Sequence, residues 1–69
     1  MIITRHAAER FAERVRPVSL TEATKQLKGF LGAAILEKED YDGDAWYRVG
    51  GLRLVVFNEH VMTCYFAGG

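Results

Sequence analysis

Disulfide bonds and long apolar segments are both missing from this sequence of 69 residues. Its one cysteine, Cys64, has no second cysteine to pair with, so no internal disulfide can stabilise the fold. We therefore expect a reducing, cytoplasmic environment. The longest run of apolar residues and glycine, Phe30 to Leu36, is far shorter than the roughly 20 residues of a membrane-spanning helix. The N-terminal residues show no signal-peptide pattern, so we expect no membrane partner.

An excess of charge of one sign is also missing. Nine Lys and Arg residues balance nine Asp and Glu residues, which gives a formal net charge of zero. Because nonspecific nucleic-acid binders are usually strongly basic, contact with nucleic acid would depend on a local basic cluster. The length predicts a single domain over residues 1–69, with a small core and marginal stability. A homodimer is one way to compensate for such a core.

Two helices are predicted in the N-terminal half. The first covers residues 5–16, which are rich in Ala, Glu and Arg; Thr4 is a suitable N-cap, and a proline follows the helix. The second covers residues 20–31. It begins at a capping box whose N-cap is Ser19, and we expect it to end at Gly32.

The C-terminal half changes to short apolar runs separated by turn residues. We expect strands over residues 33–38, 45–49, 52–57 and 60–66, joined by turns at Asp42-Gly43, Gly50-Gly51 and Asn58-Glu59. Residues 1–3 form either an edge strand or an apolar staple, and residues 67–69 a frayed tail. The predicted fold is α+β: two helices packed on a four-stranded antiparallel meander sheet, in the order ααββββ.

A basic row on the first predicted helix is the main candidate site. His6, Arg10 and Arg14 recur at intervals of four residues, so they lie along one side of the helix. A neutral imidazole can act as a general base, and arginines beside it can hold a phosphate and stabilise charge in a transition state. The simpler interpretation is a solvated helix face with Glu–Arg ion pairs along it.

Three residues of the predicted strands could complete this site. Arg53 interrupts an otherwise apolar central strand, so it either extends to solvent at the strand end or points into a site. Strict alternation places Thr63 and Tyr65 on one face of the last strand with Val61, and Cys64 on the other. Their hydroxyl groups could contact a phosphate, although Thr and Tyr are also common in strands for packing reasons.

We expect no metal ion and no organic cofactor. Asp40, Asp42 and Asp44 alternate in a loop, as calcium ligands do, but the bidentate Glu that completes such a pattern is missing. Cys64 has no neighbouring Cys or His at the spacing of a zinc site.

The order of these motifs resembles a known family. Residues 4–15, Thr-Arg-His-Ala-Ala-Glu-Arg-Phe-Ala-Glu-Arg-Val, are similar to the opening helix of a small group of domains of unknown function. That group belongs to the barnase–EndoU–colicin–RelE superfamily of toxin nucleases. Residues 51–57 and 61–65 resemble the family's closing strands, which carry a V-x-T-x-Y pattern. The resemblance implies a RelE- or BrnT-like fold and metal-independent ribonuclease activity, with His6, Arg10 and Thr63 catalytic and Arg14, Arg53 and Tyr65 in contact with the substrate.

The predicted function is therefore cleavage of RNA by its own 2′-hydroxyl. His6 would remove the hydroxyl proton, arginines would hold the phosphate, and the products would carry a 2′,3′-cyclic phosphate. The alternative is a protein-binding module without catalysis, such as an antitoxin-like or phage-encoded regulator of a host protein. The small size and zero net charge favour this alternative. Binding of RNA through arginines should weaken steeply with salt, whereas an apolar protein interface should not.

Overall fold

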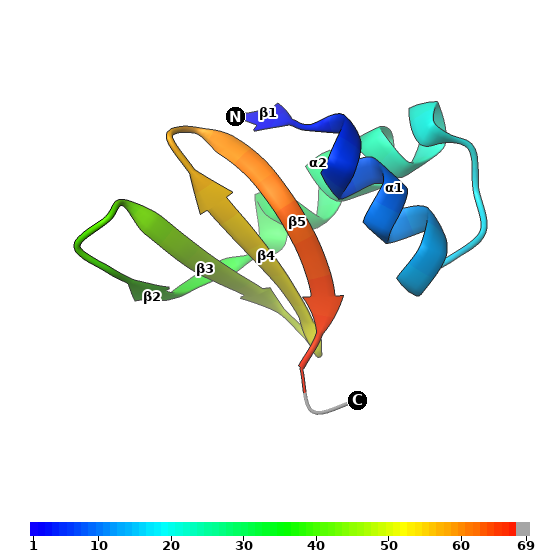
Figure 1. Cartoon of the computed structure of the whole chain (residues 1–69). Helices are drawn as coiled ribbons and strands as arrows, with labels where there is room; N and C mark the ends of the chain where they lie inside the picture. The colour runs from blue at the N-terminus through cyan, green and yellow to red at the C-terminus, as the bar shows by residue number, and fades with distance from the viewer. Residues whose placement is uncertain (68–69) are drawn as a thin grey trace.

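A computed structural model describes residues 1–67 and shows an α+β domain, which confirms the predicted fold class (Figure 1). The elements are β1 (Ile2–Ile3), α1 (Arg5–Arg14), α2 (Leu20–Ala33), β2 (Ile35–Glu39), β3 (Asp44–Val49), β4 (Leu52–Phe57) and β5 (His60–Phe66). In this part of the chain, no helix is long and apolar enough to cross a membrane. Gly68 and Gly69, which belong to the predicted frayed tail, lie outside the described residues.

The sheet has five strands, in the order β1-β5-β4-β3-β2. Strands β2 to β5 form the predicted antiparallel meander. The fifth strand, β1, pairs in parallel with the start of β5, so the sheet is mixed and the element order is βααββββ rather than ααββββ. A strand of two residues shows no periodicity, and for this reason the sequence does not distinguish an edge strand from an apolar staple at Ile2 and Ile3.

Both helices begin at the predicted caps. The side-chain oxygen of Thr4 accepts a hydrogen bond from the backbone N–H of Ala7 at 3.2 Å. The Oγ of Ser19 accepts one from the N–H of Glu22 at 3.1 Å. Each bond satisfies a backbone donor that has no partner within its own helix, so the two caps fix where the helices start.

The ends of the helices differ from the prediction. Helix α1 ends at Arg14, two residues earlier than predicted. Helix α2 continues through Gly32 to Ala33, so the predicted stop at Gly32 is wrong. Its C-cap, Ala34, is already extended and leads directly into β2, so the helix ends without a left-handed glycine.

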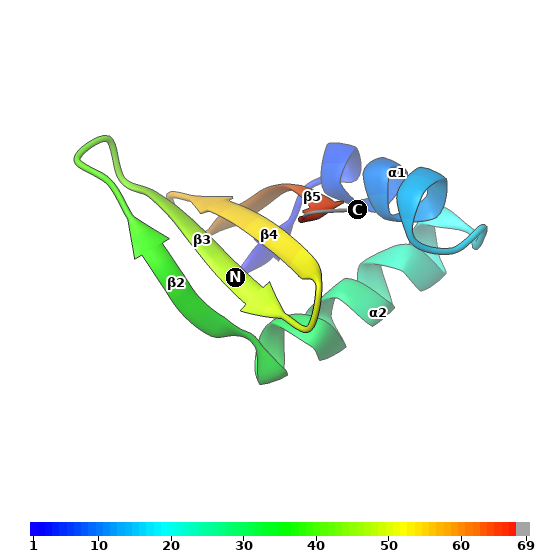
Figure 2. The ribbon, with the colours of Figure 1, turned by 90° about the horizontal axis from the view of Figure 1, so that it is seen from below.

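The helices pack on one face of the sheet and leave the other uncovered (Figures 1 and 2). The buried core consists of Ala7, Ala8, Phe11, Ala23, Leu27, Leu52, Leu54, Val56, Val61 and Cys64. The partly buried ring of Phe30 packs against the core at Phe11, and the centroids of the two rings are 6.0 Å apart. The β2–β3 hairpin projects away from the helices, and every residue of β2 is exposed. The helix-free face and the β2 edge are therefore open to other molecules.

A bulge changes which side chains of β5 share a face. The register of β4 and β5 shifts near the start of β5, so β5 carries an additional residue there. As a result, Val61 and Cys64 are both buried against the helices, while Thr63 and Tyr65 lie on the helix-free face. The prediction that Val61 shares a face with Thr63 and Tyr65 is wrong, because strict alternation does not anticipate a bulge.

Turns occur at the three predicted places. Asn58 and Glu59 both have positive φ, 50° and 65°, and join β4 to β5. Gly50, with φ of 58°, joins β3 to β4, and Gly43, with φ of 92°, lies in the β2–β3 loop. The two glycines adopt these angles without strain, but Asn58 and especially Glu59 do so at a cost in free energy.

Candidate functional site

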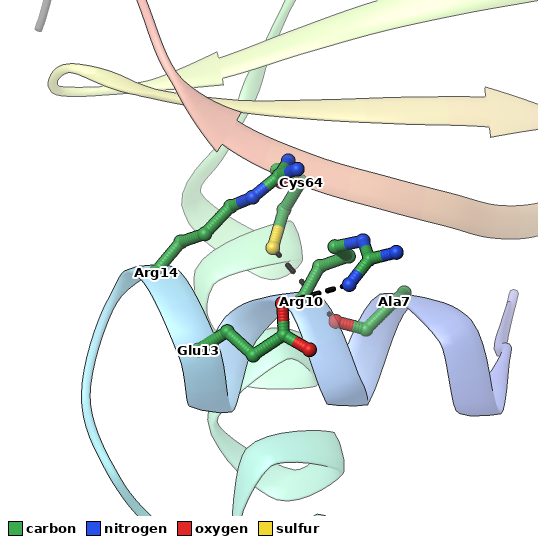
Figure 3. Close-up of polar contacts among 5 residues, drawn as sticks. All are labelled: Ala7, Arg10, Glu13, Arg14 and Cys64. Atoms are coloured by element: carbon green, nitrogen blue, oxygen red, sulfur yellow. Dashed lines mark hydrogen bonds and ion pairs between the residues drawn. The ribbon is translucent and has the colours of Figure 1, made fainter.

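The predicted row His6–Arg10–Arg14 lies on α1 beside β5. Figure 3 shows Arg10 and Arg14 extending from the helix toward that strand. Nη1 of Arg10 donates to Oε2 of Glu13 at 2.7 Å, and Nη1 of Arg14 donates to the carbonyl oxygen of Cys64 at 3.2 Å. His6 is exposed and makes no hydrogen bond or ion pair within residues 1–67. Both arginines thus have protein partners, and the Arg10–Glu13 pair is of the kind expected for a solvated helix face.

Arg14 and Thr4 fasten the two ends of α1 to β5. The Oγ1 of Thr4 donates to the carbonyl oxygen of Val61 at 2.7 Å, in addition to capping the helix. Near Arg14, Sγ of Cys64 donates to the carbonyl oxygen of Ala7 at 3.8 Å. Burial raises the pKa of the Cys64 thiol, and the Arg14 guanidinium opposes that shift. The contact with β5 gives Arg14, alone of the three residues in the row, a structural role beside the sheet.

The other predicted residues, Arg53, Thr63 and Tyr65, lie on the helix-free face. Arg53 is the cross-strand partner of Tyr65, and the next pair along the strands, Leu54 and Cys64, is fully buried on the helix side. Among the described residues, no hydrogen bond or ion pair joins this group to the row on α1. The structure therefore divides the six predicted residues into two groups of three.

Two residues that the sequence analysis did not select join Arg53 and Tyr65. Oε1 of Glu37 accepts from Nε of Arg53 at 3.0 Å, and Oε2 of Glu37 lies 3.4 Å from Nε of Arg48. Arg53 is also a cross-strand partner of Arg48, and its side chain is only 18% exposed, compared with 44% for Arg48. Glu37, Arg48, Arg53 and Tyr65 thus form a line across β2, β3, β4 and β5, which we call the arginine row.

A second line of residues runs beside the arginine row. Lys38, Trp46, Val55 and Thr63 are successive cross-strand partners from β2 to β5, and we call them the tryptophan row. The Nζ of Lys38 lies 5.1 Å from the centroid of the Trp46 ring, in a cation–π contact. The part of the chain that the structure describes encloses no pocket. The two rows together present cationic, aromatic and hydroxyl groups on one face of the sheet.

The position of the Gly50-Gly51 turn in the sequence is enough to predict that Arg48 and Arg53 are cross-strand partners. Arg48 and Arg53 lie two positions outside the predicted Gly50-Gly51 turn, one on each side, so a two-residue hairpin makes them partners. Glu37 is harder to place from sequence. The register of β2 and β3 shifts between Leu36 and Lys38, and this bulge determines the face on which the Glu37 side chain lies.

The acidic loop between β2 and β3 is organised by its own backbone. Oδ1 of Asp40 accepts from the backbone N–H groups of Asp42 at 3.0 Å and Asp44 at 3.2 Å. Within residues 1–67, no three His, Cys, Asp or Glu side chains are grouped so that they could hold a metal ion. The carboxylate of Asp40 therefore serves the turn.

Comparison with known proteins identifies no relative of this chain. No protein-family model matches it, and no curated protein or solved structure matches it either. The resemblance of residues 4–15, 51–57 and 61–65 to the toxin-nuclease superfamily therefore stays a prediction.

Proposed function

We propose that this chain acts on RNA, binding a single strand across the helix-free face of the sheet and cleaving it without a metal ion. The arginine row carries the proposal, because Arg48 and Arg53 present two adjacent guanidinium groups that converge on one carboxylate, Glu37. The likeness of residues 4–15 to the toxin nucleases of the RelE superfamily supports RNA as the substrate, and a RelE-like ancestry is part of the same proposal.

The phosphate of the RNA would take the place of Glu37 at the two guanidinium groups. Guanidinium binds phosphate oxygens through paired N–H donors, as it binds a carboxylate. Arg53 is held by the carbonyl oxygen of Gly50 at 3.2 Å, so it would keep its position. The Arg48 side chain is more exposed and has no second partner among the described residues, so it would turn toward the phosphate.

Aromatic rings beside the arginines suit the bases of a single strand. Trp46 and Tyr65 are both partly exposed and belong to neighbouring rows of the helix-free face. Bases of single-stranded RNA stack on such rings with little dependence on sequence, while cations nearby hold the backbone. A neutral chain can bind RNA in this way because Lys38, Arg48 and Arg53 concentrate positive charge on this face.

Cleavage would proceed by attack of the 2′-oxygen on the adjacent phosphorus. The bond from phosphorus to the 5′-oxygen breaks, which leaves a 2′,3′-cyclic phosphate and a 5′-hydroxyl. Glu37, displaced from the arginines by the phosphate, would accept the proton of the 2′-hydroxyl, and water or Tyr65 would return a proton to the leaving oxygen. His6 is the alternative base, because it is exposed and has no protein partner within residues 1–67.

An RNA pool incubated with the purified protein in EDTA tests this proposal. We expect cyclic-phosphate ends from the wild type and a loss of at least tenfold in Arg48→Ala. Arg5→Ala is the matched control, since Arg5 is an exposed arginine that lies on α1 and pairs there with Glu9. Loss in Glu37→Gln but not in His6→Ala would assign the base to Glu37, and the reverse would assign it to His6. No cleavage by the wild type at high concentration would overturn the nuclease proposal.

Protein binding without catalysis is the second candidate, and the exposed apolar side chains favour it. Ile35 and Leu36 on β2 are 58% and 45% exposed, and Phe57 on the helix-free face is 42% exposed. Such residues could contact an antitoxin or a host protein. Binding that persists at high salt would support this candidate, because contacts with RNA through arginines weaken steeply with salt.

A further inference from the structure

Among the described residues, the sheet ends in the two-residue β1 on one side and in the five-residue β2 on the other. Strand β1 covers only the start of β5, and groups of α1 contact β5 further on. Thr4 donates from both its backbone N–H and its Oγ1 to the carbonyl oxygen of Val61, and Arg14 donates to that of Cys64. Strand β2 has a neighbour on one side alone over all five of its residues. It is therefore the longer of the two edges at which another strand could pair.

The ladder shows which backbone groups of β2 point outward. Cys64, Leu54, Tyr47 and Leu36 are successive cross-strand partners from β5 to β2. The carbonyl of Cys64 points away from β4, because it accepts from Arg14. In an antiparallel sheet, hydrogen-bonded and non-hydrogen-bonded pairs alternate across such a line. The N–H and C=O of Leu36 therefore point away from β3, toward the open edge.

The other end of β2 gives a second outward pair of groups. The backbone N–H of Asp40 donates inward, to the carbonyl oxygen of Asp44 at 3.0 Å. Successive residues of a strand direct their backbone groups to opposite sides, so those of Glu39 point outward. Leu36 and Glu39 thus offer two donors and two acceptors on the free edge of β2.

We propose that β2 pairs with β2 of a second copy of this chain, in antiparallel orientation about a two-fold axis between Glu37 and Lys38. Leu36 then forms backbone hydrogen bonds with the partner subunit's Glu39, and Glu39 forms them with the partner subunit's Leu36. The bulge does not prevent this pairing, because both strands carry it and the two-fold axis relates one to the other.

Charge complementarity selects this register. It places Glu37 opposite the partner subunit's Lys38 on both sides of the axis, and opposite charges in direct cross-strand positions stabilise a sheet. Glu37 and Lys38 share the helix-free face, since Glu37 contacts Arg53 and Lys38 covers Trp46. A shift of one residue would place Glu37 opposite itself or Lys38 opposite itself, which is unfavourable.

The shortness of the β1 edge limits this association to a dimer. A two-fold interface uses the same strand of both copies, so the two β2 edges cover one another and only the two-residue β1 edge of each copy remains. The charged residues of β2 discourage pairing with arbitrary strands, as charges on edge strands generally do. Two five-stranded sheets would join into one, with their helix-free faces continuous. This inference does not depend on activity toward RNA.

Sedimentation equilibrium from low micromolar to millimolar concentration tests the dimer. The mass of the wild type should rise from that of the 7.8 kDa chain to twice that value. Lys38→Glu places like charges across the axis and should weaken association at least tenfold. Lys28→Glu, with the same change in charge on the exposed side of α2, should associate as the wild type does. A wild type that stays monomeric, or equal association of the two variants, would overturn the proposal.

Hydrogen exchange locates the interface without any variant. The amides of Leu36 and Glu39 should become protected as the protein concentration rises, while other amides keep their rates. Leu36→Pro removes one outward N–H and no intrachain hydrogen bond, so it should fold and remain monomeric. Concentration-dependent protection at other positions, with none at Leu36 and Glu39, would contradict pairing through β2.

Discussion

Glu37 and Arg53 lie 3.0 Å apart, between Oε1 and Nε, although the whole of β3 separates their strands. Arg48 lies on β3, between these two strands, and its Nε is 3.4 Å from Oε2 of Glu37. Three strands are thus tied together on the face that no helix covers. The same guanidinium groups are those proposed to hold a phosphate, so under this proposal the carboxylate and the RNA would compete for them.

Loss of this carboxylate should reduce stability. We expect Glu37→Gln to lower the free energy of unfolding by about 0.5–1 kcal/mol, because Arg48 and Arg53 are left adjacent without a counter-charge. Urea denaturation at low salt measures the effect, which should shrink at high salt. Glu9→Gln is the control, since its partner Arg5 is 81% exposed and the loss should be close to zero. Equal effects of the two variants would contradict a special role for Glu37.

The same variant should separate binding from cleavage. Without the competing carboxylate, Glu37→Gln should bind single-stranded RNA at least as tightly as the wild type, and it should cleave RNA far more slowly if Glu37 is the base. Filter binding and end-group analysis of the same samples measure the two properties. Weaker binding by Glu37→Gln would argue against displacement of Glu37 by phosphate.

Most of the fold follows from local patterns in the sequence. Thr4 and Ser19 determine the starts of the helices through side-chain oxygens, and glycine or Asn-Glu turns separate the strands. The two-residue β1 is not predictable in this way. It depends on the N–H of Ile2 donating to the carbonyl oxygen of Glu59 at 2.8 Å, a contact between distant parts of the chain.

The site was less predictable because bulges decide which face a side chain occupies. Alternation alone does not place Glu37 beside Arg53, since the pairing of β2 shifts register next to it. Alternation also predicts that Val61 shares a face with Thr63. In the structure, Val61 lies on the opposite face, buried against the helices. A helical period, by contrast, places His6 and Arg14 on one side of α1 without further information.

The two helix caps should differ in their importance. Ser19→Ala should cost about 1 kcal/mol, the usual effect of losing an N-cap. Thr4→Ala should cost more, because the Oγ1 of Thr4 also donates to the carbonyl oxygen of Val61 at 2.7 Å and so ties α1 to β5. Chemical denaturation of both variants measures the difference. A smaller loss in Thr4→Ala would show that this tie adds nothing.

Stability should decrease at alkaline pH partly through Cys64. Burial raises the pKa of its thiol, so the folded chain holds the proton more strongly than the unfolded chain does. This contribution is fully present below the ordinary thiol pKa and is lost as the pH rises through the raised value. Cys64→Ala should therefore lose stability less steeply over that range than the wild type. Parallel slopes for the two proteins would contradict the assignment.

The turn between β4 and β5 should accept a glycine with a gain in stability. Glu59 has φ of 65°, a conformation that is unfavourable for a residue with a side chain and normal for glycine. We expect Glu59→Gly to raise the free energy of unfolding by about 0.5–1 kcal/mol. Gly50→Ala, at φ of 58°, is the converse and should destabilise the fold. A loss of stability in Glu59→Gly would mean that its side chain makes a compensating contact.

The fluorescence of Trp46 tests the central claim most directly. It is the sole tryptophan of the chain, and it lies on the helix-free face beside the arginine row. A single-stranded RNA titrated into the protein in EDTA should quench this fluorescence by stacking on the ring. The affinity should decrease with salt, with a slope that is smaller by about 1 in Arg48→Ala. Unchanged fluorescence at saturating RNA, or quenching that salt does not affect, would contradict RNA binding on this face.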